Sequence, residues 1–448
     1  NNSAMGYFSL LGNQSGNNNT AIGSYSLRSN SSGSFNTAVG FNSLYSNTNG
    51  LNNTSVGSYS LYSNTSGGHN TASGYFSLYK NTTGFENTAT GNFALYSNTI
   101  GSNNTANGNS ALRNNISGIN NTSSGYYSLN YNTTGSHNTA NGTASLQLNI
   151  SGNNNTASGS NSLRNNISGY ENSAFGVNSL NSNTFGYFNS AIGASALYSN
   201  TSGNLNTSFG HNSLYSNTIG YANTANGDGS LYSNIEGHNN TANGYFSLWS
   251  NTSGEHNSGV GVGSLYLNTS GSFNSANGWD ALRNNLTGNE NSAIGVWALR
   301  NNISGNGNTA IGYNADVTSG NFNNSTVIGS NALVDDSNKI RIGNTSVTVI
   351  EGQVGWSTPS DLRLKENIIQ NNRLGLNFIT KLNPVRYNYI SDITKTMHDG
   401  FIAQEIESII DTLKLPFSGL KKSTDGNYSL TYSDFIMPLV NSIKEQQN

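Results

Sequence analysis

Aromatic side chains that could bind a ligand recur at fixed places along much of this 448-residue chain. Most of them stand one or two residues after a glycine, with Ser and Asn close by. Aromatic rings stack on sugar faces while neighbouring amides bond sugar hydroxyls, so this pattern indicates carbohydrate binding. Stacking of each ring on its counterpart in the next repeat explains the same pattern without a ligand. The candidate ligand-contacting residues are Tyr75, Phe76, Tyr126, Tyr127, Tyr245, Phe246, Trp249, Trp279 and Trp297.

Five of the six histidines lie in turn segments and raise the question of a metal site. Structural and catalytic zinc sites place their ligands at short, characteristic spacings. These histidines are not grouped at such spacings, and we expect no acidic partner in phase with them. The sequence therefore predicts no bound metal and no other cofactor. The five residues are His69, His137, His211, His238 and His256.

Cleavage of an external glycan requires two carboxyl groups that face each other across a cleft. The acidic residues of the repeat region stand mostly one or more repeats apart, and no pair of them recurs. The sequence therefore predicts no enzymatic action on an external substrate. These residues are Glu86, Glu171, Asp228, Glu236, Glu255, Asp280 and Glu290.

The element that carries these residues is a 17-residue repeat, Asn-Thr-Ala-x-Gly-x-x-Ser-Leu-x-x-Asn-x-x-Gly-x-x, which occurs eighteen times without an insertion. Its first Asn recurs from Asn2 to Asn308, and its Leu recurs from Leu10 to Leu299. A short fixed period indicates stacked units that contact only their neighbours. Two glycines per unit disfavour a helix. The sequence therefore predicts an all-β rod, a parallel β-solenoid or β-roll, with about 4.8 Å per coil and a length of roughly 90 Å.

Within each repeat we expect two short strands, Thr-Ala-x-Gly and x-Ser-Leu, with turns at Asn-x-x-Gly and at the repeat junction. The Asn at a fixed place in every coil predicts a ladder of side-chain amides along the rod. The two glycine columns mark turns that need a positive φ or a close backbone approach.

The core of one coil is thin, because each repeat supplies one Leu, one small residue and only sometimes a third apolar group. Burying a Leu stabilises by about 1.5–3 kcal/mol, whereas ordering each residue of the backbone costs roughly 1–2 kcal/mol. Association of several chains would bury the remaining apolar edge. We therefore expect a parallel homotrimer, with a monomeric solenoid as the alternative.

Composition narrows the class of protein further. A net charge of −3 gives no electrostatic footprint for nucleic acid. The absence of cysteine excludes disulfides. The sequence contains no run of about 18 apolar residues, so it predicts no segment that inserts into a membrane. The chain begins within a repeat and without a signal peptide, so we expect either a piece of a longer protein or export by assembly on a larger particle.

Charge and proline divide the chain into parts. Residues 1–316 hold six basic and eight acidic side chains. The last 132 residues hold twelve basic and thirteen acidic side chains, together with all four prolines. We predict a rod over residues 1–316, a strand-rich cap and neck over 317–356, and a small α+β domain over 357–448 whose last helix is truncated. In this domain the pattern predicts a strand at 382–390, a helix at 401–413, a strand at 428–432 and a helix from 435.

Two segments near the end of the rod, at 308–315 and 326–333, carry the sequences Asn-Thr-Ala-Ile-Gly-Tyr-Asn-Ala and Thr-Val-Ile-Gly-Ser-Asn-Ala-Leu. They resemble the head repeats of trimeric autotransporter adhesins. Those heads are trimeric left-handed β-rolls with shorter coils. Because the 17-residue spacing departs from theirs, the resemblance suggests handedness and trimer geometry without fixing either.

The last 90 residues contain a second set of motifs in a fixed order. They are Ser-Asp-Leu-Arg-Leu-Lys-Glu-Asn-Ile at 360–368, Leu-Asn-Pro-Val-Arg-Tyr-Asn-Tyr at 382–389, Gly-Phe-Ile-Ala-Gln-Glu-Ile-Glu at 400–407, Leu-Thr-Tyr at 430–432 and a segment at 438–447. This region resembles the endosialidase-type intramolecular chaperone, also called the peptidase S74 domain. Domains of this family end phage tail fibres, tailspikes and some other surface proteins. They hold three chains together while the fibre folds, and then they cut themselves off.

The resemblance implies roles for two residues. Ser360 corresponds to the nucleophile and new N-terminus, and Lys365 to its partner, so the cut would fall between Pro359 and Ser360. A serine hydroxyl attacks well only when a neighbouring base takes its proton, and a lysine is such a base only when its surroundings favour the neutral amine. Asp361 and Arg363 are expected to form a structural ion pair. The alternative is that the motif serves folding alone, without cleavage.

These observations together predict an extracellular, trimeric fibre for adhesion or for binding a host-surface glycan receptor, carried by a phage or phage-like particle as part of the virion tail. Its partners would be two further copies of the chain and the receptor, with no nucleic acid and no membrane. The alternative is a bacterial cell-surface adhesin that retains the same chaperone.

Overall fold

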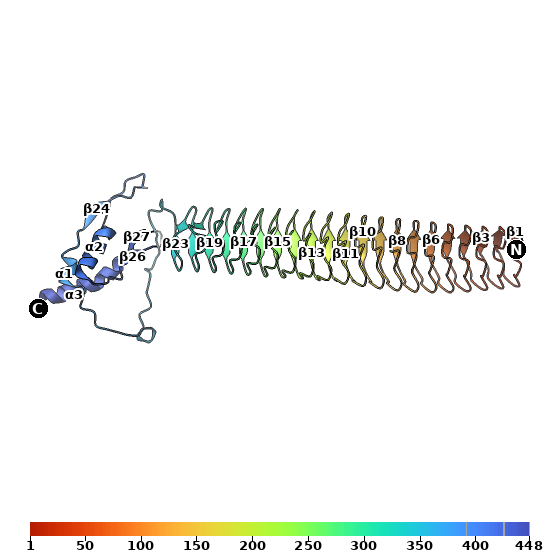
Figure 1. The fold of residues 1–448 in the computed structure, drawn as a ribbon, viewed down its shortest axis with the longest axis horizontal. Coiled ribbons are helices and arrows are strands. Elements are labelled where there is room, and N and C mark those ends of the chain that lie inside the picture. The colour runs from red at the N-terminus through yellow and green to blue at the C-terminus, as the bar shows by residue number, and fades with distance from the viewer. Residues whose placement is uncertain (391, 424–425, 448) are drawn as a thin grey trace.

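The computed structural model describes residues 1–390, 392–423 and 426–447. Most of the chain forms a rod of stacked coils, and the C-terminal region lies at the end of the rod opposite the N-terminus (Figure 1). The predicted parallel β-solenoid of 17-residue coils is confirmed, with about 20 turns, as is the small α+β region that follows it.

Each regular coil contributes one three-residue strand to a single parallel sheet. Consecutive strands pair in register, so that every residue lies beside the residue 17 positions later. The strands of these coils are β1 (Ser3–Met5), β2 (Thr20–Ile22), β3 (Thr37–Val39), β4 (Thr54–Val56), β5 (Thr71–Ser73), β6 (Thr88–Thr90), β7 (Thr105–Asn107), β8 (Thr122–Ser124), β9 (Thr139–Asn141), β10 (Thr156–Ser158), β11 (Ser173–Phe175), β12 (Ser190–Ile192), β13 (Thr207–Phe209), β14 (Thr224–Asn226), β15 (Thr241–Asn243), β16 (Ser258–Val260), β17 (Ser275–Asn277), β18 (Ser292–Ile294), β19 (Thr309–Ile311) and β21 (Thr326–Ile328).

The prediction of a second strand in each repeat, at x-Ser-Leu, is wrong. This segment is a turn in which Tyr25 and Leu27 have φ values of 61° and 48°, and the same left-handed positions recur in the other coils. The turn buries the adjacent residues Ser26 and Leu27 together, whereas a strand would point them to opposite faces. Left-handed backbone costs a non-glycine residue about 1–2 kcal/mol, and burial of the Leu, about 1.5–3 kcal/mol, offsets it.

The interior of the rod consists of three columns of small or branched side chains. They are the middle strand residue, represented by Ala21, the Ser or Ala at Ser26, and the Leu at Leu27, all fully buried. The Ser26 hydroxyl donates to the Gly23 carbonyl at 2.9 Å. Where Ser55 replaces the strand Ala, its hydroxyl donates to the Ser60 carbonyl at 3.0 Å, so the core tolerates this polar group because it is satisfied.

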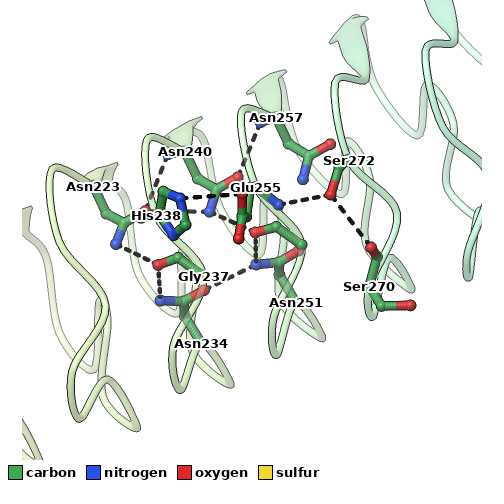
Figure 2. A network of polar contacts seen from close by, with 11 residues as sticks. Asn223, Asn234, Gly237, His238, Asn240, Asn251, Glu255, Asn257, Ser270 and Ser272 are labelled. Atoms are coloured by element: carbon green, nitrogen blue, oxygen red, sulfur yellow. Dashed lines mark hydrogen bonds and ion pairs between the residues drawn. The ribbon is translucent and has the colours of Figure 1, made fainter.

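Two ladders of buried asparagines, one more than the sequence predicted, hold consecutive coils together (Figure 2). In the first, the backbone N–H of Asn240 donates to Asn223 Oδ1 at 3.0 Å. In the second, Asn251 Nδ2 donates to Asn234 Oδ1 at 2.9 Å. The two ladders meet at the Gly237 carbonyl, which accepts from Asn223 and Asn234 at 2.8 and 2.9 Å. Each buried amide therefore has partners both within its coil and along the rod.

The two columns require glycine for different reasons, both of which the sequence predicted. Gly23 has a φ of 122°, a region that side chains rarely adopt. Gly33 has no positive φ, but a Cβ there would collide with the Gly50 carbonyl of the next coil and with Asn30 Oδ1. The second column is therefore fixed by the close approach of the Asn ladder.

The rod closes with an irregular cap. The main sheet continues from β21 to β23 (Ile340–Ile342) after a 14-residue coil, and β20 (Asp316–Val317) pairs in parallel with β22 (Leu333–Val334). The Asp316 carboxylate is buried between these coils and accepts from the backbone of Val317 and Asn301. Residues 344–361, all of which the structure describes, form a neck without helix or strand.

The C-terminal region is a small α+β unit with its own core. It comprises the 3₁₀ helix η1 (Leu362–Leu364), α1 (Leu376–Ile379), the antiparallel pair β24 (Val385–Tyr387) and β25 (His398–Gly400), α2 (Ala403–Leu413), the antiparallel pair β26 (Leu420–Lys422) and β27 (Tyr428–Leu430), η2 (Tyr432–Phe435) and α3 (Ile436–Gln447). The predicted strands near 385 and 428 and both predicted helices are present. Its buried side chains are Leu374, Phe378, Ile406, Phe417 and Phe435.

Within the described part of the chain, none of the helices has the length and apolar character that crossing a membrane requires.

Candidate functional site

The structure brings together the serine and lysine that the sequence motif singled out. Lys365 Nζ donates a hydrogen bond to Ser360 Oγ at 2.6 Å. The short helix η1 lies between them and folds the chain back, because the Lys365 backbone N–H donates to the Leu362 carbonyl. Both side chains are exposed on the single chain.

Asp361 and Arg363 stabilise this turn, as the sequence predicted. Asp361 caps η1 by accepting from the Arg363 backbone N–H at 2.9 Å, and the two side chains form an ion pair at 2.6 Å. The Arg363 guanidinium holds the pKa of Asp361 below its usual value. The carboxylate is thereby engaged in fixing the turn, which leaves Lys365 as the group in contact with the Ser360 hydroxyl.

The contact has the geometry of a nucleophile and its base. A lysine ammonium donates to the serine oxygen, and loss of one proton from the nitrogen lets the hydroxyl donate in the opposite direction. Apolar side chains within the motif and shortly before it in the chain are exposed to solvent: Trp356 is 90% exposed, and Leu362 and Leu364 are each 72% exposed. A surface that covered them would exclude water from the pair and favour the neutral amine.

The nine candidate aromatic residues do not form one site. They lie in four groups spread along the rod, with Tyr75, Tyr126, Tyr245 and Trp279 exposed and their neighbours half-buried. The densest group joins Tyr245, Phe246 and Trp249. The ring centroids of Tyr245 and Phe246 lie 3.8 Å apart, and those of Phe246 and Trp249 lie 4.4 Å apart.

Stacking between coils is extensive in the aromatic columns. Phe76 stacks on Tyr59 and Phe93 at 5.0 and 5.7 Å, and Trp249 stacks on Tyr232 at 4.3 Å. The interpretation that these rings stabilise their own sheet face therefore has direct support. Contact with a ligand remains a prediction for the exposed members.

Two histidines have acidic partners in phase with them, one repeat later in the chain. His211 and Asp228 are 17 residues apart and lie 3.5 Å from each other. His238 and Glu255 have the same spacing and lie 3.1 Å apart. The expectation of no acidic partner in phase is wrong, because the structure makes neighbours of residues one full repeat apart. Comparing each histidine with the residue at i + 17 would have revealed both pairs.

A long β-solenoid rod that ends in a small α+β unit fits a fibre-type protein. Residues 360–415 match the family Peptidase S74, chaperone of endosialidase. The chain thus carries this domain at its C-terminus, and the match begins at Ser360 and includes Lys365. None of the curated proteins matches the chain.

Proposed function

We propose that the protein is a homotrimeric fibre that binds a host-surface receptor for a phage or phage-like particle, and that its C-terminal domain assembles three chains and then cuts itself off. The observation that carries this proposal is the joining of a long, regular solenoid to a chaperone-of-endosialidase domain. A stack of nearly identical coils supplies reach and a repeated surface. The chaperone domain would bring three such chains together in register.

The exposed apolar surface of the neck and C-terminal region supports self-association. Val354, Trp356 and Ile369 are 84%, 90% and 83% exposed. Helix α3 adds an apolar face that the rest of the chain leaves uncovered, comprising Ile436, Met437, Leu439, Val440 and Ile443. Exposed apolar surface of this extent marks an interface. Three copies of these segments packed around one axis would cover it.

The proposed cleavage uses Ser360 and Lys365 in fixed roles. Ser360 Oγ attacks the carbonyl carbon of Pro359 while its proton passes to Lys365 Nζ. The bond between that carbon and the Ser360 nitrogen breaks as the nitrogen takes up a proton, which leaves an ester. Water then hydrolyses the ester to give a chain ending at Pro359 and another beginning at Ser360. Trimer assembly would trigger these steps by burying the pair.

Intact-mass analysis of freshly folded protein tests the proposal. The wild-type chain should yield the two fragments, and Ser360→Ala should remain whole while still assembling. Lys365→Ala should also remain whole, whereas Glu366→Gln is a matched neighbouring change that should leave cleavage intact. Full-length wild-type chains in a completed trimer would reduce the domain to a chaperone. Cleavage of Ser360→Ala would disprove the assigned nucleophile.

For the receptor, we propose a carbohydrate bound at Tyr245, Phe246 and Trp249. Gly229, one coil earlier, makes room for these rings, because a Cβ there would collide with both Phe246 and Trp249. Tyr245 is exposed beside Phe246 and Trp249, and an exposed aromatic ring suits a sugar face. Trp249→Ala should abolish binding to the host surface polysaccharide, and Tyr62→Ala, in a separate stack of rings, should not. Equal binding by the two variants would contradict this site.

A further inference from the structure

We propose that His238, Glu255 and His256 form a binding site for a divalent transition-metal ion that links two consecutive coils of the rod. Each residue offers one ligand atom, and these atoms all lie within 4.8 Å of one another. Among residues 1–390, 392–423 and 426–447, these three are the one group of this kind. Two imidazoles and one carboxylate are a ligand set that Zn²⁺ and similar ions bind, with water in the remaining position.

The repeat explains how residues from two coils converge. His238 stands just before β15, and Glu255 and His256 stand just before β16, one coil later. His238 and Glu255 occupy the same column, and His238 Nε2 lies 3.1 Å from Glu255 Oε2 (Figure 2). Ligand atoms bound tetrahedrally at about 2.1 Å lie about 3.4 Å apart. The first pair is therefore already close to ligand spacing, and the ligand atom of His256 lies within 4.8 Å of both partners.

The backbone on each side of the three ligands is anchored by the Asn ladder. Gly237 and Gly254, which precede His238 and Glu255, both accept hydrogen bonds from ladder asparagines. The His256 N–H donates to the His238 carbonyl at 3.1 Å, and the Glu255 N–H donates to Ser272 Oγ at 3.0 Å (Figure 2). The backbone that carries the ligands is thus anchored before an ion binds, which lowers the cost of binding.

Aromatic neighbours orient both imidazole rings. His238 stacks on Tyr221, with ring centroids 4.5 Å apart and an interplanar angle of 11°. His256 stacks on Phe273 at 4.9 Å and 5°. The two imidazoles are nearly perpendicular, with centroids 5.9 Å apart and an angle of 74°. With neutral imidazoles the Glu255 carboxylate gives the cluster one negative charge, which suits a divalent cation.

Other coils of the same rod supply a replacement for His256. Phe occupies the His256 position, with the same left-handed φ, at Phe35, Phe188 and Phe273. His256→Phe therefore removes a ligand while keeping a residue that the rod already accommodates. Glu255→Gln removes the charge and keeps the shape. The matched control is His211→Tyr, because His211 and Asp228 form a histidine–acid pair one repeat apart but belong to no group of three.

The test is titration of the full, tag-free chain with Zn²⁺ alone by calorimetry, followed by Co²⁺ as a spectroscopic probe. Wild type and His211→Tyr should bind one ion per chain, and His256→Phe and Glu255→Gln should each weaken binding at least about tenfold. Visible d–d absorption of the Co²⁺ form should disappear in both ligand variants. Zn²⁺ at 100 times its Kd should slow hydrogen exchange of β15 and β16 by about 100-fold.

Two results would overturn the proposal. One is a wild-type chain that binds no Zn²⁺ at a stoichiometry of one. The other is equal affinity of wild type and His256→Phe, each checked for its rod fold by circular dichroism. If His256→Phe loses the fold, Glu255→Gln decides the question by the same titration.

Discussion

The buried Asn ladder should be a main source of cohesion between coils, and Asn138→Ala tests this. Asn138 is fully buried in the middle of the rod. Its Oδ1 accepts from the backbone N–H and from Nδ2 of Asn155 at 3.0 and 3.2 Å. Its own Nδ2 donates to the Gly152 carbonyl at 2.8 Å and to Asn121 Oδ1 at 3.1 Å. Alanine removes these contacts and leaves the Asn155 N–H buried without an acceptor.

The magnitude follows from which groups lose their last partner. Gly152 still accepts from Asn149, and Asn155 Nδ2 still donates to Gly169, so only the Asn155 N–H is orphaned. A buried unsatisfied donor costs about 1–3 kcal/mol, and each of the three other lost bonds contributes about 1 kcal/mol. The variant should lose about 5 kcal/mol of local stability, which corresponds to roughly a 5,000-fold increase in the local opening constant.

Hydrogen exchange with mass spectrometry measures this directly in peptides that cover residues 138–156. The matched control is Asn141→Ser in the same strand. Asn141 is exposed, and the flanking coils carry Ser124 and Ser158 at its position. The control should exchange like wild type. Equal exchange in the two variants would refute the claim that the ladder, rather than the strand pairing alone, holds the coils together.

Two further predictions concern the core and the cap. Leu146→Asp should break the stack locally in thermal unfolding, because it places an unpaired charge at a fully buried position. Tyr198→Ser should cost only about 1 kcal/mol, since it removes one stacked pair with Tyr215, and equal losses would overturn the inside–outside assignment. Burial raises the pKa of Asp316 from 3.8 to about 7, so the folded cap binds this proton more tightly than the unfolded chain does. The free energy of unfolding should therefore fall by up to roughly 4 kcal/mol as pH rises from 4 to above 7. Asp316→Asn should lack this part of the pH dependence of the melting temperature, and identical pH profiles would contradict the buried-carboxyl account.

The regular features of the rod could be predicted because a residue type that recurs in every repeat indicates which positions are buried and which are exposed. A Leu in every coil had to be the core, and an Asn in every coil had to stack on itself. The turn at Tyr25–Leu27 could not be predicted from alternation, because its left-handed residues place Ser26 and Leu27 on the same side. Single-residue patterns do not report φ, and bulky residues with positive φ run against ordinary preference.

The candidate sites were predictable to different degrees. A turn of the motif brings Ser360 and Lys365 together, and the resemblance of this motif to the chaperone family had already paired them. The proximity of His238 and Glu255 depends on the register between consecutive coils. The periodic sequence contains this register, but it becomes visible only when positions one repeat apart are compared. The dispersal of the aromatic residues into four groups also follows from this register.

The native mass of freshly folded Ser360→Ala protein tests whether three chains form the fibre, because this variant keeps the whole C-terminal domain attached. Native mass spectrometry or light scattering should give a particle of three 47.4 kDa chains, about 142 kDa, that persists on dilution. A stable, folded particle of 47.4 kDa would contradict the claim that the C-terminal domain assembles the rod into a trimeric fibre.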